Sequence, residues 1–168
     1  MYIIDPDPFV APAYRISPFR TSDISFNNEL DESSLIDTYF SKRFVNRKFV
    51  YCKNARNAIY LALTHYNLKE DDYVTILTTT NNFYISSCVT SEIEKFCKWS
   101  REITPATKVI FVNHEFGYPF ENLEGLKKYK LPIIEDCAHA FFSSDENHNI
   151  GKVGDFVIYS FPKMFPIQ

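Results

Sequence analysis

Two stretches near the C-terminal end of the sequence carry side chains of complementary chemistry. The stretch IIEDCAHAFF is an apolar run that leads to two carboxylates, Glu135 and Asp136, and the stretch GDFVIYSFPKMFPIQ is a run that leads to a lone amine, Lys163. Apolar runs of this kind are typical of buried strands in a parallel sheet. Because ligands collect at the carboxyl ends of such strands, an acid and an amine at two of these ends could act on one ligand.

Pyridoxal phosphate is a cofactor that requires such a pair. Its aldehyde bonds to a lysine amine, and its ring acts as an electron sink when an acid keeps the ring nitrogen protonated. Its phosphate needs donors, and a helix N-terminus supplies them. Lys163 and Asp136 could be the amine and the acid, the segment NARN at residues 54–57 could hold the phosphate with the Ser160 hydroxyl, and Phe83 could stack on the ring.

Strands and helices alternate along the rest of the sequence, which predicts an α/β fold with a mostly parallel sheet. Residues 1–34, rich in Pro, Asp, Asn and Ser, are expected to form an extended lead-in that wraps around the domain or crosses to a partner. The hydrophobic pattern predicts helices over 34–45, 55–66, 81–90 and 122–130 and strands over 48–54, 72–78, 92–99, 106–114, 131–138 and 155–161.

The composition fits one domain with a substantial core and argues against several classes of function. The chain has 168 residues, of which 45% are hydrophobic and 17% aromatic, and its formal charge is −3. No basic stripe points to nucleic acid or to anionic lipid, and neither a signal peptide nor a membrane-spanning run is predicted. The four cysteines form no CxxC pair, so we expect reduced thiols in the cytoplasm and no metal site.

Five segments, in order, resemble the DegT/DnrJ/EryC1/StrS family of sugar aminotransferases, which are fold-type I enzymes that use pyridoxal phosphate. The similar segments are KNARNAIYLAL, DYVTILTTTNNFYIS, TKVIFVNHEFGYP, PIIEDCAHA and GKVGDFVIYSF, and together they cover roughly residues 45–163. The resemblance implies a three-layer fold, with helices on both faces of the sheet, like the large domain of those enzymes. It divides the chain into a lead-in with a helix, residues 1–44, and a large-domain portion, residues 45–168.

Position by position, the resemblance also implies functional residues. It gives Lys163 as the lysine bonded to the cofactor, and as cofactor contacts Arg56, Asn57, Phe83, Asp136, His139 and Ser160. His139 stands beside the ring hydroxyl, where the family usually has Gln. The family's common spacing before the lysine is S-F-x-x-x-K, whereas this sequence reads S-F-P-K.

The implied activity is transfer of an amino group from an amino acid, glutamate in the family, to a nucleotide-linked keto-sugar for a surface polysaccharide. The implied assembly is a homodimer. Lys163, once released from the cofactor, would act as the general acid and base, for which its pKa must fall through burial and nearby positive charge. We expect neither nucleic acid nor a membrane as a partner.

The length of the chain raises an alternative. Family members are about twice as long, and their next strand lies between the strand that ends near Lys163 and the first strand, 48–54. Without that strand, both neighbours would lack a partner. A truncated, catalytically inactive homologue with a structural role, or with none, is therefore the second hypothesis, and another α/β small-molecule-binding domain is the third. The phosphate-loop patterns GxGxxG and GxxxxGK[ST] are absent from the sequence.

Each candidate residue also has an ordinary structural interpretation. Asp136 could cap backbone amides at the start of a loop, and Phe83 could belong to the core, since the chain has 16 Phe residues. His114 and His139 could be hydrogen-bonded core histidines, and Lys163 could be a solvated surface lysine. Only the ordered set of segments favours the functional interpretation of Asp136, Ser160 and Lys163.

Overall fold

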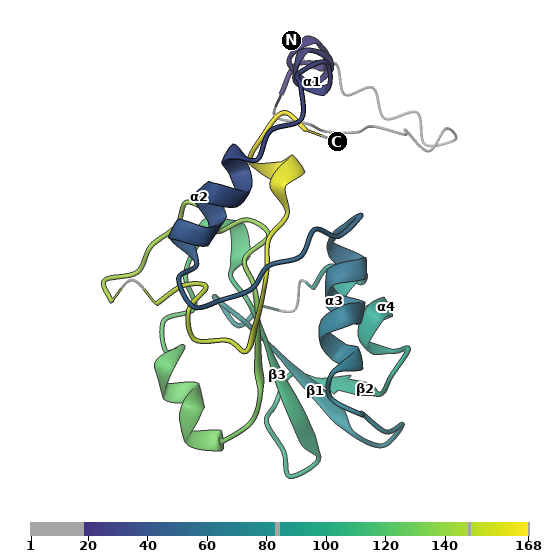
Figure 1. Ribbon diagram of the computed structural model, residues 1–168. Coiled ribbons are helices and arrows are strands. Elements are labelled where there is room, and N and C mark those ends of the chain that lie inside the picture. Colours follow the sequence, from purple (N-terminus) through teal and green to yellow (C-terminus); the bar gives the residue numbers. More distant parts are fainter. Residues whose placement is uncertain (1–18, 83–84, 148, 168) are drawn as a thin grey trace, which may run out of the picture.

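The computed structural model describes residues 19–82, 85–147 and 149–167, which form an α/β fold (Figure 1). Lys163 and most of the other candidate site residues fall inside these ranges. Phe83 and about the first half of the predicted lead-in lie outside the described residues. The elements, in chain order, are α1 (Thr21–Asn28), α2 (Leu35–Arg43), α3 (Ala55–Thr64), β1 (Tyr73–Thr78), α4 (Ser87–Ile93), β2 (Lys98–Ser100), β3 (Thr107–Asn113), η1 (Glu115–Gly117), η2 (Glu124–Tyr129), β4 (Ile133–Asp136), β5 (Phe156–Ile158) and η3 (Phe161–Lys163).

The five strands form one sheet in the order β2-β1-β3-β4-β5, and every pair in it is parallel. The prediction of a mostly parallel sheet is therefore confirmed. The central strand β3 has an almost continuously buried run, because helices cover both of its faces. All carboxyl ends lie along one edge, where Thr78, Asn113 and Asp136 pair in register.

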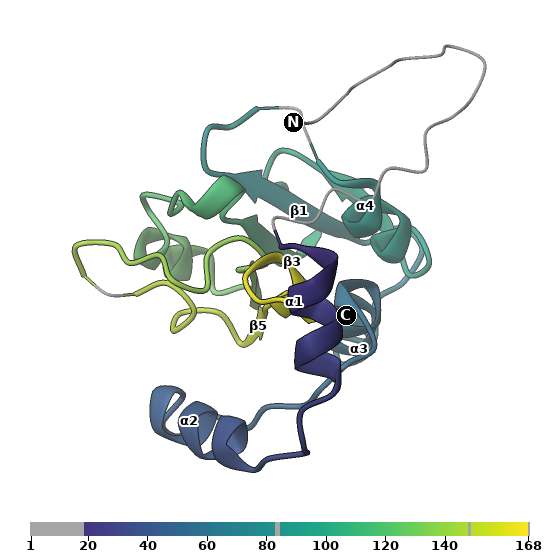
Figure 2. The ribbon, with the colours of Figure 1, turned by 90° about the horizontal axis from the view of Figure 1, so that it is seen from above.

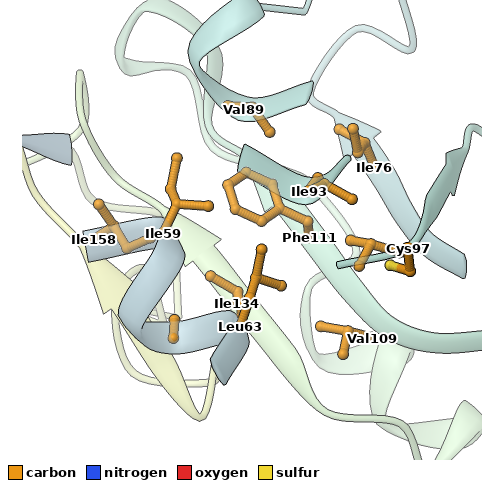
Figure 3. Packing of buried hydrophobic residues seen from close by; sticks show 12 residues of the cluster. Ile59, Leu63, Ile76, Val89, Ile93, Cys97, Val109, Phe111, Ile134 and Ile158 are labelled. Carbon is orange, nitrogen blue, oxygen red and sulfur yellow. The ribbon is translucent and has the colours of Figure 1, made fainter. Parts of the chain in front are cut away.

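Two hydrophobic clusters occupy the two faces of the sheet. On one face, α3 and α4 pack Ile59, Leu63, Val89 and Ile93 against Phe111, which lies at the centre of Figure 3. These helical residues are spaced four apart in each helix, so they share one side of it. The arrangement buries a continuous apolar layer between sheet and helices.

On the other face, two leucines, one in η2 and one just before it, pack against the central strands. Leu123 and Leu126 pack with Ile110, Val112 and Ile133. Figure 1 shows η2, in green, across the sheet from α3 and α4. The three-layer arrangement implied by the resemblance is thus present, although the predicted helix 122–130 is a 3-10 helix in the structure.

The predicted strand over residues 48–54 is wrong. Residues 47–52 have no regular structure, and β5 forms the edge of the sheet in the described chain. A strand requires a neighbour for its backbone hydrogen bonds, and none pairs with this segment. Its Phe49 and Tyr51 instead contribute rings to a cluster around Phe40, at centroid distances of 5.6 and 6.4 Å.

Two further predictions miss their boundaries. The predicted helix 81–90 starts later, at Ser87, because the Ser86 side chain accepts a hydrogen bond from the Cys88 amide and caps it there. The helix then continues through Ile93, so the predicted strand 92–99 is reduced to the short edge strand β2. The predicted lead-in also differs, because residues 21–28 form the helix α1 rather than extended chain.

The helix α2 connects the N-terminal part of the fold to its C-terminal segment. Phe40 of α2 is buried and stacks on Phe161 of η3, with the ring centroids 5.2 Å apart and the planes at 16°. Arg43 lies over the ring of Phe141, 4.1 Å from its centroid, and donates a hydrogen bond to the Phe141 carbonyl. Figure 2 shows the C-terminal segment, in yellow, close to α1. Among the described helices, none is both long enough and apolar enough to cross a membrane.

A buried carboxylate, that of Glu135 in β4, anchors the segment that precedes β5. Its two oxygens accept hydrogen bonds from the amides of Gly151, Val153 and Gly154, at 2.7, 2.9 and 2.5 Å, and one of them also lies 3.2 Å from His114 Nε2. Gly154 is needed for this approach, because a Cβ there would lie 3.0 Å from Glu135 Cγ and 2.9 Å from a carbonyl oxygen. Burial raises the pKa of Glu135, but the hydrogen bonds from His114 and from the glycine amides outweigh it, and the net shift is downward.

We expect Glu135→Gln to lower the free energy of unfolding at pH 7 by about 2 kcal/mol, since hydrogen bonds to a charged acceptor are lost. Because the pKa of Glu135 is lowered in the folded state, its stabilisation is present above the ordinary carboxylate pKa of about 4.3 and is lost as the pH falls through the lower folded value. The difference between wild type and variant should therefore shrink in acid. Urea denaturation over a pH series measures it.

Glu124→Gln is the matched control for this substitution. Glu124 forms an exposed ion pair with Lys127 within η2, so its replacement should change stability by less than about 0.5 kcal/mol. Equal effects of the two substitutions would contradict an anchoring role for Glu135.

Candidate functional site

The alternation of side chains along β4 separates its two acids. Ile134 faces α3 and α4, while Ile133 faces η2. Asp136, two residues after Ile134, therefore faces the α3 side at the carboxyl edge, and Glu135 faces the opposite side. The candidate site accordingly lies on the α3 side of this edge.

Asp136 is buried, with 8% of its surface exposed, and its Oδ1 accepts a hydrogen bond of 2.9 Å from the Ala138 amide. Its Oδ2 has no hydrogen-bond partner among the described residues. Burial raises the pKa of Asp136, while the Ala138 amide, the positive charge of Lys163 and the nearby His114 oppose that rise. The carboxyl group is thus buried at the site with one oxygen free for a cationic or protonated ligand.

Lys163 ends η3, immediately after β5, and its side chain is exposed. Its positive charge lowers the pKa values of Asp136, His139 and Cys88. These effects put the amine within electrostatic reach of all three residues, which come from α4 and from the end of β4 with the loop after it. The predicted proton transfer requires burial of Lys163 to lower its pKa, but the described residues leave its side chain exposed.

His139 lies in the loop after β4, three residues after Asp136, and is partly buried. Burial and the charge of Lys163 lower the pKa of its imidazole, which favours the neutral ring. Its ring stacks on Phe116 of η1, with centroids 5.7 Å apart and planes at 18°. A neutral imidazole can serve as either donor or acceptor, which suits contact with a ligand hydroxyl.

The N-terminus of α3 points its first amides to the same edge. Asn54 caps the helix, and its side chain accepts a hydrogen bond of 3.0 Å from the Asn57 amide. That amide is therefore engaged, and the amides of Ala55 and Arg56 have no hydrogen-bond partner among the described residues. Unpaired amides at a helix N-terminus attract anions.

Arg56 and Cys88 form a contact that the sequence did not predict. The Arg56 Nε donates a hydrogen bond to the Cys88 sulfur at 3.3 Å, which joins α3 to α4. This hydrogen bond is the main cause that lowers the pKa of Cys88; burial opposes it, and Ser86 and the charges of Arg56 and Lys163 assist it. The sequence places these residues 32 positions apart, and only the packing of the two helices brings them together.

Ser160 is the residue before η3 and is partly exposed, with no capping hydrogen bond from its side chain. Its hydroxyl is thus available beside Lys163. Phe83, predicted to stack on the cofactor ring, lies outside the described residues. The structure therefore brings Asp136, His139 and Lys163 into one neighbourhood, with Arg56 nearby through Cys88.

A second buried cluster lies on the η2 side of the sheet. His114, Glu135 and Cys137 offer ligand atoms within 4.8 Å of one another. However, His114 Nδ1 accepts a hydrogen bond of 3.0 Å from the Phe120 amide, and the oxygens of Glu135 accept from three amides and from His114. Because these donors and acceptors are satisfied by the protein, the cluster is structural. The interpretation of His114 as a hydrogen-bonded core histidine is confirmed.

Comparison with known proteins gives a consistent family. The model of the DegT/DnrJ/EryC1/StrS aminotransferase family matches residues 93–167. GDP-perosamine synthase from Escherichia coli O157:H7 is 30% identical over 73% of this chain and 39% of its own length. An uncharacterized protein of Methanocaldococcus jannaschii is 30% identical over 71% of this chain and 36% of its own.

Shorter and structural matches agree with this result. A dTDP-3-amino-3,6-dideoxy-alpha-D-galactopyranose transaminase from Aneurinibacillus thermoaerophilus is 37% identical over 38% of this chain and 18% of its own length. The crystal structure of the aminotransferase TlmJ from Streptoalloteichus hindustanus superposes with a TM-score of 0.55 at 19% identity, over 67% of this chain and 35% of that one. The last match supports the fold, and in each case this chain matches well under two thirds of the relative.

We predict that Cys88 is alkylated by iodoacetamide at a lower pH than an ordinary thiol, because the lowered pKa of Cys88 leaves more thiolate. Arg56→Gln removes the hydrogen bond and the charge, so the pH midpoint of the reaction should move upward. Mass spectrometry of alkylated peptides over a pH series measures the midpoint.

Cys52 serves as the internal control for this measurement, because it is also free and partly buried. Its alkylation should not respond to Arg56→Gln. A Cys88 profile that is the same in wild type and variant would contradict the Arg56–Cys88 contact.

Proposed function

We propose that this chain, a member of the DegT/DnrJ/EryC1/StrS aminotransferase family, carries the pyridoxal-phosphate site of a sugar aminotransferase. The proposed reaction moves an amino group from an amino acid such as glutamate to a nucleotide-linked keto-sugar for a surface polysaccharide. Homodimer formation and a cytoplasmic location belong to the same proposal. The names of the relatives, a perosamine synthase and a sugar transaminase, support the substrate class.

One observation carries the proposal. The strand β4, which ends at Asp136, pairs with β5, which leads to Lys163, and the positive charge of Lys163 acts on both Asp136 and His139, although both precede it by more than twenty residues. An amine, a buried acid and a partly buried imidazole thus lie within electrostatic reach of one another at the carboxyl edge of a parallel sheet, where α/β folds bind ligands.

The residues present fit the cofactor. Pyridoxal phosphate supplies an electron sink that makes a proton on the amino-acid carbon acidic. A protonated ring nitrogen would give Asp136 the cationic partner that its buried, partly unpaired carboxyl group lacks. The unpaired amides of Ala55 and Arg56, with the Ser160 hydroxyl, suit a phosphate.

The chain's own residues would then have separate tasks. Lys163 would bond to the cofactor aldehyde and, when free, carry a proton on its Nζ between the α-carbon of the substrate and the former aldehyde carbon of the cofactor. Asp136 would hold a proton on the ring nitrogen. His139 would hydrogen-bond the ring hydroxyl, and its lowered pKa keeps it neutral for that contact.

We expect borohydride reduction, after addition of pyridoxal phosphate, to fix the cofactor on Lys163. Peptide mass mapping of wild type should find the label there, and Lys163→Ala should lose it. Lys128→Ala is the control, because Lys128 is an exposed lysine of η2 on the opposite face of the sheet. Labelling spread over several lysines, unchanged in Lys163→Ala, would reject the assignment and favour a homologue without a cofactor.

Asp136→Asn should weaken the binding of pyridoxal phosphate roughly 10- to 100-fold, since a hydrogen bond to a charged group is lost. Absorbance titration of the bound cofactor measures the affinity. Asp71→Asn is the control, because it removes the same negative charge at an exposed ion pair with Lys98. This variant should bind the cofactor as wild type does. Equal affinity of Asp136→Asn and wild type would exclude Asp136 as the ring-nitrogen acid.

A further inference from the structure

Phe116 has a backbone conformation that is unusual for an aromatic residue. Its φ is +48° and its ψ is 30°, in the left-handed region. Of the other non-glycine residues with positive φ in the described chain, three are asparagines, which tolerate that region, and one is Lys130, which ends η2. A side chain with a Cβ raises the free energy of this conformation, so surrounding contacts must maintain it.

The turn around Phe116 is fixed from both sides. On the β1 side, the carboxylate of the preceding residue, Glu115, accepts hydrogen bonds from the amide and hydroxyl of Thr80, at 2.9 and 3.0 Å. On the β4 side, the Ser143 hydroxyl donates to the carbonyl of the following residue, Gly117, at 2.6 Å. Gly117 has φ of +88°, and a Cβ there would lie 3.3 Å from the Ser143 oxygen.

The ring of Phe116 makes its described aromatic contact with His139 alone. The two planes are nearly parallel, at 18°, and the centroids lie 5.7 Å apart. Phe116 is otherwise 67% exposed, so its ring adds little to the core. An asparagine or a glycine would form the same turn at a lower conformational cost, which indicates that the ring serves the contact with His139.

We propose that Phe116 is a positioning residue, whose ring fixes the plane of the His139 imidazole at the carboxyl edge of the sheet. The contact links the loop after β3 to the loop after β4. The ligand that His139 would meet, the ring hydroxyl of pyridoxal phosphate, rests on the proposed function above. The stacking itself, and its effect on His139, do not depend on a cofactor.

The charges around His139 make its titration a direct measure of this role. Lys163, from η3, and burial both lower the pKa of His139. Removal of the Phe116 ring would expose one face of the imidazole to water, and the pKa of His139 should then rise toward its ordinary value. A purely structural role for Phe116 would change stability without this specific shift.

The experiment compares Phe116→Gly, Phe116→Tyr and wild type by NMR titration of the histidine rings, without cofactor. The His139 signal is assigned with His139→Gln. We expect the pKa of His139 to rise in Phe116→Gly and to stay at the wild-type value in Phe116→Tyr, which keeps the stacking ring. The unfolding midpoint of Phe116→Gly should stay within about 3 °C of wild type, because glycine relieves the backbone strain.

Lys130→Gly is the matched control, because Lys130 has φ of +55° but lies at the end of η2, away from the histidine. It should leave the His139 titration unchanged. If Phe116→Gly does not fold, Phe116→Asn replaces it, since asparagine also accepts positive φ. An unchanged His139 titration in the folded variant would overturn the proposal.

A second measurement separates this proposal from the proposed function. Phe116→Gly should bind pyridoxal phosphate roughly 2- to 10-fold more weakly than wild type, in proportion to the loss of one aromatic contact. If wild type takes no label on Lys163, the proposed function fails, while the cofactor-free titration still decides the role of Phe116. If wild type is labelled and the His139 titration does not change, only the positioning role fails.

Discussion

The buried carboxylate of Glu135 is the interaction on which the site depends. Three amides of the segment before β5 converge on it, so β5 can pair with β4 only where these hydrogen bonds form. Asp155 adds a second link between the two strands. Its side chain accepts a hydrogen bond from the Ile133 amide, and its own amide donates one to the Ile133 carbonyl. The segment GKVGD is therefore a structural element that fixes the register of the last strand and, through it, the start of η3.

Adjacent acids in one strand have separate environments because side chains alternate between the two faces of a sheet. Glu135 is buried among amide donors, and hydrogen bonds lower its pKa. Asp136 is buried with a single amide, and burial raises its pKa. The first acid is electrostatically satisfied by the protein, while the second is not. A ligand with a positive or protonated group is the natural complement to the second.

The sequence predicts the strands well where apolar runs are continuous, as in β3 and β4, because burial on both faces imposes that pattern. It wrongly predicts a strand over 48–54, because a strand also needs a neighbouring strand to pair with. The residues of one segment do not show whether such a neighbour is present. It predicts Asp136 and Lys163 as site residues from their places after apolar runs and His139 from the resemblance, and these assignments stay predictions. The contact of Arg56 with Cys88 and the left-handed turn at Phe116 depend on packing and on backbone torsion, and no residue pattern signals either.

The amine of the site is positioned by aromatic packing and not by the sheet. β5 ends at Ile158, so its hydrogen-bond ladder stops before Lys163. Phe161, two residues before the lysine, stacks on Phe40 of α2 and meets the edge of Phe141, with centroids 5.2 and 5.4 Å away. The loss of either partner would remove one of the ring contacts that hold η3. Because Phe40 lies in α2, a helix more than a hundred residues away in sequence takes part in placing η3, and with it Lys163, after β5.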